Sequence, residues 1–199
     1  MAITMKRHAP LALAAVLAAA LAGPALSGHG LEPEAKVLAT PVDASVAEHG
    51  VLIGRASVGG MLIQMELEHA NAMWMLKGEP AKWMKMGIAP GQLYHVEVKP
   101  IDPKSNTRIP YAKVTFMAVN TDTGEKVEGM LHPMWGGSGL HYAFNSGLAG
   151  DGTYEAKVTV GVPTFARAVD DKRWMEPVTG NFHFKLNDGM LTEVSEPEE

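Results

Sequence analysis

The chain has 199 residues, no cysteine and a formal net charge of −5 at pH 7. Without cysteine it has neither disulfides nor thiolate chemistry, so its stability must come from a packed core. The acidic balance argues against a nucleic acid or an anionic membrane surface as partner.

The N-terminal segment, residues 1–27, has the pattern of a cleavable signal peptide. Lys6 and Arg7 precede an apolar run from Leu11 to Gly23, and small residues flank the expected cleavage point after Ser27. This run is shorter than the roughly 20 residues of a membrane-spanning helix; an uncleaved anchor is the alternative. Cleavage removes two of 17 basic and none of 22 acidic residues, which leaves a net charge of −7. The mature protein is therefore expected to be exported, without membrane insertion.

The remaining chain is predicted to form one domain, residues 49–192, between an extended leader, 28–48, and an acidic tail, 193–199. Short segments in this domain alternate between apolar and polar residues and are separated by turn signals. Strands are predicted over residues 60–70, 93–99, 112–120, 126–134, 153–162 and 178–186. Residues 70–89 fit neither a strand nor a helix period. The spacing favours an antiparallel β-sandwich, with an up-and-down barrel as the alternative.

Metal-ligating side chains recur on two of the predicted strands. His95 and Glu97 share one strand face, as do His132 and Met134, because side chains alternate along a strand. The glycine-rich stretch after Met134 looks like a tight turn, which could bring His141 back near Met134 or merely turn a corner. Imidazole, carboxylate and thioether ligands suit iron or copper better than calcium, magnesium or structural zinc. Each pair alone is a weak signal, since polar residues on a solvated face give the same pattern.

A wider set of motifs resembles the periplasmic ferrous-iron transport family, which works beside a high-affinity iron permease. The stretch from Pro110 contains the family's NTDTG hairpin, a strand ending in HPM where the family has M-P-M, and the H-Y pair with a later Asn. Upstream is the H-x-E motif. Downstream are the family's G-x-Y, F-G-R-H and W-F-x-P-F motifs in the forms GTY, FARA and WMEP. The resemblance covers roughly residues 94–184.

This resemblance implies an immunoglobulin-like antiparallel β-sandwich, usually a homodimer, in the periplasm. It also implies tight copper binding and a role in iron uptake with an inner-membrane iron permease as partner. Carried over residue by residue, the metal ligands are His95, Glu97, Met134 and His141.

Three departures from the family pattern concern this site. Lys99 replaces an acidic residue two positions beyond H-x-E, and Ala168 replaces the histidine of F-G-R-H. His132 replaces the first Met of M-P-M, which could restore a nitrogen ligand, so His132 is a fifth candidate. These departures leave open a structural sandwich with a vestigial site that acts only by protein contact.

A second candidate for metal chemistry is the Met- and Trp-rich stretch outside the matched region. Thioethers favour cuprous ions, and a tryptophan could shield such an ion by cation–π contact. A copper chaperone or tolerance protein is therefore the alternative function, although adaptable packing residues would look the same. Its candidate ligands are Met73, Met75, Met84 and Met86. No catalytic motif is recognisable, and the protein is not expected to be an enzyme. A redox enzyme is the remaining alternative, although nothing in the sequence identifies an electron donor.

Overall fold

The part of the chain described by a computed structural model comprises residues 39–46 and 50–195. It forms thirteen strands. None of these residues belongs to a helix that could span a membrane. The predicted signal peptide, residues 1–27, lies outside this part.

All strand pairs in the described residues are antiparallel. In chain order the strands are β1 (Ala39–Ser45), β2 (Val51–Val58), β3 (Met61–His69), β4 (Met73–Lys77), β5 (Lys82–Met86), β6 (Tyr94–Asp102), β7 (Thr107–Arg108), β8 (Val114–Asn120), β9 (Lys126–Gly136), β10 (Gly139–Ser146), β11 (Gly152–Val160), β12 (Val178–Asn187) and β13 (Met190–Ser195).

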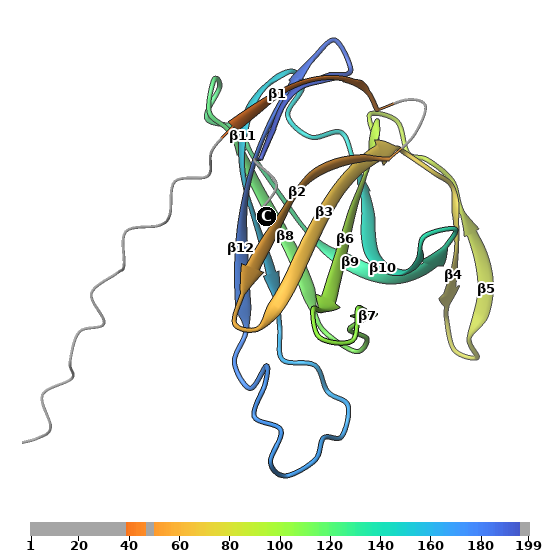
Figure 1. Ribbon diagram of the computed structural model, residues 1–199. Coiled ribbons are helices and arrows are strands. Elements are labelled where there is room, and N and C mark those ends of the chain that lie inside the picture. Colours follow the sequence, from red (N-terminus) through yellow and green to blue (C-terminus); the bar gives the residue numbers. More distant parts are fainter. Residues whose placement is uncertain (1–38, 47–49, 196–199) are drawn as a thin grey trace, which may run out of the picture. The chain divides into compact units, whose positions relative to one another are not determined.

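Ten strands follow one hydrogen-bonded path, in the order β1-β13-β12-β11-β8-β9-β10-β6-β3-β2, and β7 joins β6. Strand β9 takes part in two sheets, because residues 126–131 pair with β8 and residues 132–136 pair with β10. The path therefore divides into two sheets that lie face to face (Figure 1). β8 lies beside β11 and β10 beside β6, which excludes the up-and-down alternative. The predicted antiparallel β-sandwich is confirmed.

The core lies between the two sheets and follows the predicted alternation. Along β3, Met61, Ile63, Met65 and Leu67 are buried, while the residues between them are only partly covered. The opposite sheet contributes aromatic side chains such as Phe182. In the central strand β6, the side chains on both faces are buried. Those on one face point into the core, and those on the other are covered by polar side chains of the neighbouring strands. This second face carries the candidate site.

The predicted strands correspond to β3, β6, β8, β9, β11 and β12, with ends shifted by a few residues. Other strands lie where none was expected. β1 falls in the predicted leader and pairs with β13, which itself extends to Ser195 in the predicted tail. β10 follows a tight turn after β9, and residues 70–89 contain the separate β4–β5 hairpin.

Candidate metal centre

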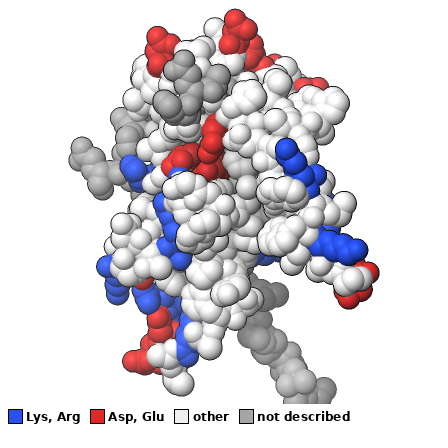
Figure 2. Space-filling view, turned by 90° about the vertical axis from the view of Figure 1, so that its right-hand side faces the viewer, with Lys and Arg blue, Asp and Glu red and all other residues white. Residues whose placement is uncertain are grey.

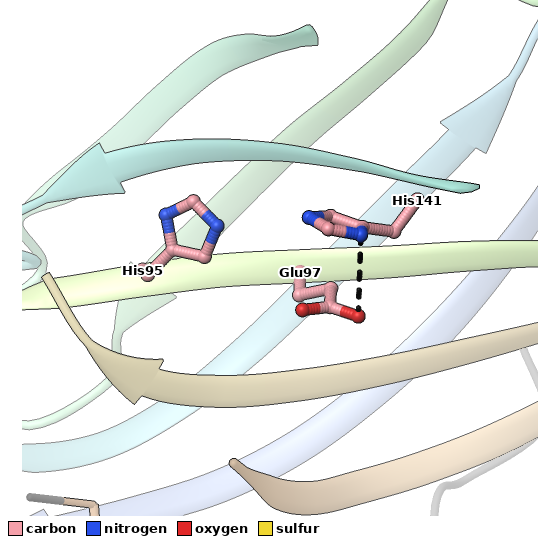
Figure 3. A group of neighbouring side chains, drawn as sticks. All are labelled: His95, Glu97 and His141. Carbon is pink, nitrogen blue, oxygen red and sulfur yellow. Dashed lines mark ion pairs between the residues drawn. The ribbon is translucent and has the colours of Figure 1, made fainter. Parts of the chain in front are cut away.

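Three potential metal ligands meet on the outer face of β6 and its neighbour β10. His95 and Glu97 are two residues apart on β6, so both project from the same face. β10 lies antiparallel to β6 and carries His141. One ligand atom from each residue lies within 4.8 Å of the others, and all three side chains are buried (Figure 3). The imidazoles meet edge to face with ring centroids 6.2 Å apart. The sequence predicted His95 and Glu97 on one strand face, and the sheet adds His141 from β10 to this pair.

Met134 joins this cluster through the register of β9 and β10. Met134 lies directly opposite His141, and both residues line a pocket of about 370 Å³. The other lining residues are His95, Glu97, Glu68, Asn71 and the turn 136–138. The thioether is therefore available beside the two imidazoles and the carboxylate. Figure 2 shows the molecule from the side on which the β4–β5 hairpin stands in Figure 1. Acidic side chains gather near the middle of this face.

Hydrogen bonds fix the orientation of both imidazoles. Nδ1 of His141 lies 3.0 Å from the carbonyl oxygen of Gly139, which can only accept. Nδ1 of His95 lies 2.8 Å from Oδ1 of Asn145, and the amide nitrogen of Asn145 donates to the carbonyl of Asn71 over 2.8 Å. Both Nδ1 atoms thus carry the hydrogen in the neutral rings, and Nε2 keeps the lone pair that a metal needs.

Ser138 and Lys99 are two of the residues that donate hydrogen bonds to Glu97. The hydroxyl of Ser138 donates to Oε1 over 2.8 Å. The Lys99 ammonium lies 2.7 Å from the same oxygen and 2.5 Å from Oε2 of Glu66. Lys99 therefore points toward the carboxylates of Glu66 and Glu97 rather than away from the site. Its side chain is 5% exposed, so it is an internal cation that competes with a metal for Glu97.

Burial and these contacts shift the proton affinities of the site. Burial lowers the pKa of His95, despite the opposing hydrogen bond with Asn145. Burial alone would raise the pKa of Glu97, but hydrogen bonds from Lys99, Glu68 and Ser138 outweigh it, so this pKa is lowered. Burial, the hydrogen bond to Glu97 and neighbouring negative charges raise the pKa of Glu68 to about 7. At neutral pH, His95 and Glu97 are thus in the deprotonated forms that bind metals.

The two remaining positions discussed from the sequence lie apart from this cluster. His132 is on the same face of β9 as Met134, but opposite Ala143, and does not line the pocket. Ala168, which replaces the family histidine, is exposed in the segment between β11 and β12. The potential metal ligands that line the pocket are therefore two imidazoles, one carboxylate and one thioether.

Sequence reasoning missed the residues that support this set. Glu66 and Glu68 were recognised only as the polar face of a strand, although β3 places them opposite Glu97 and His95. Ser138 gave no signal of its own, and Asn145 was noted only as the Asn of a family motif, without a role at the site. Their roles depend on the register of β10, which follows from pairing between segments far apart in the sequence.

A β-sandwich that gathers two imidazoles, a carboxylate and a thioether in one pocket is a candidate metal-binding protein. Residues 97–187 match the family model described as Fe2+ transport protein. This match confirms the resemblance to the ferrous-iron transport family that the motifs indicated. No curated protein sequence matches the chain.

Solved structures of metal-binding proteins have a similar fold. The copper-reconstituted P19 protein of Campylobacter jejuni is 27% identical, with a TM-score of 0.57, over 70% of this chain and 97% of P19. A copper-bound variant of P19 is 26% identical, with the same TM-score, over 74% of this chain and 100% of its own. FetP of uropathogenic Escherichia coli is 24% identical, with a TM-score of 0.56, over 70% of this chain and 97% of FetP.

Proposed function

We propose that this chain is a periplasmic metal-binding protein of high-affinity iron uptake, which binds copper or iron at the pocket on β6. The ligands are His95, Glu97, Met134 and His141. The observation that carries the proposal is the convergence of His95, Glu97 and His141 within one buried cluster. The family match and the copper-bound P19 structures support the same chemistry.

The ligand set fits a metal that changes its oxidation state. The imidazoles and the carboxylate accept either oxidation state of copper or iron, and the thioether favours the reduced one. The protein holds the ligands in place through Asn145, Gly139 and Ser138, so little rearrangement is needed on binding. His132 stays outside this ligand set because it does not line the pocket.

The proposed physiological role is delivery of iron to an inner-membrane permease, with the protein acting as a homodimer in the periplasm. The family resemblance and the predicted signal peptide support this role. FetP, which has the same fold, was expressed in the periplasm of E. coli for its crystal structure. Uptake of radiolabelled iron by cells that lack the chain, compared before and after complementation, tests delivery.

The test of binding is calorimetric titration of the mature, metal-free protein with Cu(II) and, anaerobically, with Fe(II). We expect about one ion per chain, with His95→Ala and His141→Ala each weakening Cu(II) binding by more than roughly 100-fold. His183→Ala is the matched control, because His183 is also buried and pairs with carboxylates, but on β12 in the other sheet. Equal affinity in all three variants would reject the site.

A further inference from the structure

The β4–β5 hairpin presents four methionines in matched pairs. Met73 lies opposite Met86, and Met75 lies opposite Met84. Residues directly opposite each other in an antiparallel pair project to the same face, and residues two apart along a strand do so as well. All four thioethers therefore lie on one face of the two-stranded ribbon. Trp74 and Trp83 lie on the other face, so the strand register does not support cation–π shielding by these indoles.

These methionines do not fill the core. β4 and β5 pair only with each other among the described strands, and Met84 is 51% exposed. Met73, Met75 and Met86 are half-buried. By contrast, Met61 and Met65 are 2% and 0% exposed in the sandwich core. Packing into the core therefore explains Met61 and Met65 but not the methionine face of the hairpin.

The chemistry of this face selects a soft monovalent cation. The Cα atoms of opposite residues are about 4.5–5.5 Å apart in such a pair, and methionine has three rotatable bonds. Four sulfur atoms can thus converge on one ion. The remaining residues on this face are Lys77 and Lys82, which pair at the turn. Their positive charge and the absence of a carboxylate from this face of the hairpin disfavour hard divalent ions.

We propose that the methionine face of the β4–β5 hairpin is a second metal site, which binds one Cu(I) ion through Met73, Met75, Met84 and Met86. This site is distinct from the His95 pocket and does not depend on the function proposed for that pocket. Ag(I), a soft ion of the same charge, is expected to compete for it.

The hairpin nevertheless starts and ends beside the residue that orients His95. Asn71, two residues before β4, exchanges hydrogen bonds with the side chain of Asn145. Gln92, after β5, donates to the carbonyl of Asn145 over 3.3 Å. A change in the hairpin could therefore alter the pocket indirectly, and the test must be made in a protein without the pocket's histidines.

The experiment is anaerobic Cu(I) titration of the mature His95→Ala, His141→Ala double variant against bicinchoninate as a competing chelator. We expect about one Cu(I) per chain to be retained. Adding Met75→Leu and Met84→Leu should weaken Cu(I) binding by at least roughly 100-fold. Leucine preserves the apolar bulk on an exposed ribbon, so folding, checked by circular dichroism, should not change. Met130→Leu is the matched control, because Met130 on β9 is 49% exposed.

Two results would overturn the proposal. One is failure of the His95→Ala, His141→Ala protein to compete with the chelator. The other is unchanged Cu(I) affinity when Met75 and Met84 are replaced. X-ray absorption of the Cu(I)-loaded His95→Ala, His141→Ala protein adds a direct readout: sulfur neighbours are expected, and a shell of only nitrogen or oxygen would also refute the site. None of these outcomes depends on whether the His95 pocket binds metal.

Discussion

Lys99 is the residue that most changes the chemistry of the pocket. Its ammonium lies between Glu66 and Glu97, and its side chain is 5% exposed. A buried ion pair gains little net stability, but removing one partner leaves the other charge unpaired. Lys99 therefore stabilises the metal-free protein while competing with an incoming cation for Glu97.

The substitution Lys99→Met is expected to lower the stability of the metal-free protein by about 3 kcal/mol and to tighten Cu(II) binding at neutral pH. Stability falls because the carboxylates of Glu66 and Glu97 lose their cationic partner. Cu(II) binding tightens because Glu97 becomes available to the metal. Urea unfolding and calorimetry measure the two effects. Lys126→Met is the control, because Lys126 forms an exposed pair with Glu128 and its loss should change stability by less than about 1 kcal/mol. Weaker Cu(II) binding in Lys99→Met would show that Lys99 supports the site.

Protonation of Glu68 is expected to give the pocket a pH dependence near neutrality. With a pKa of about 7, Glu68 is mostly protonated below this pH and negatively charged above it. Cu(II) affinity should therefore rise as the pH rises through about 7, because the new charge attracts the cation. Burial lowers the pKa of His95 below the ordinary histidine value of 6.5. Protons therefore compete with the metal for this imidazole only at a pH below that value.

The measurement is Cu(II) affinity from pH 6 to pH 8 in the unmodified protein and in Glu68→Gln. The glutamine keeps the size and a hydrogen-bond donor but cannot ionise, so its profile should lack the rise near pH 7. A rise that persists unchanged in Glu68→Gln would assign the pH dependence to another group.

At the scale of elements, alternation within a strand was predictable but pairing between strands was not. The sequence placed His95 with Glu97 on one face, and it placed the core residues of β3 correctly. β4 was missed because Met73, Trp74, Met75 and Leu76 are apolar on both faces, so no polar–apolar contrast marks the strand. The contacts of Lys99 and the supporting role of Asn145 depend on neighbours from β3 and β10, which a single segment cannot reveal.

The β4–β5 hairpin is expected to be separable from the sandwich. Its strands pair only with each other within the described chain, and the backbone nitrogen of Ala70 already donates to the carbonyl of Leu93 over 2.9 Å. Replacing residues 72–88 with a short Gly-Ser linker, while keeping Asn71 and Gln92, should leave the sandwich folded. The melting temperature should change by only a few degrees, roughly what 1 kcal/mol produces in a domain of this size, and Cu(I) binding outside the pocket should disappear.

Thermal unfolding followed by near-ultraviolet circular dichroism tests this replacement. Loss of the folded signal at room temperature would contradict the view that the hairpin is an appended element. The Cu(II) affinity of the pocket provides the internal control, because its ligands lie on β6, β9 and β10 and the replacement keeps Asn71 and Gln92, which contact Asn145.

At the scale of the whole molecule, the pocket depends on the two sheets being held together. β9 connects them on one side by changing partners, and β2 approaches β13 on the other. A Cβ atom on Gly54 of β2 would lie 2.6 Å from Cβ of Ser195 on β13, so this approach leaves no room for a side chain. The pocket ligands come from three strands of one sheet, and their positions persist only while this sandwich is folded.

Metal binding should therefore stabilise the whole fold by mass action. If Cu(II) binds the folded chain and not the unfolded one, a concentration of roughly 100 times the Kd contributes about 2.7 kcal/mol. For a domain of this size, that corresponds to a rise in Tm of roughly 5–10 °C. The rise should vanish on adding a chelator and be absent in His141→Ala, which removes a ligand without touching the core between the sheets. An equal rise in His141→Ala would mean that the stabilising Cu(II) ion binds outside the pocket.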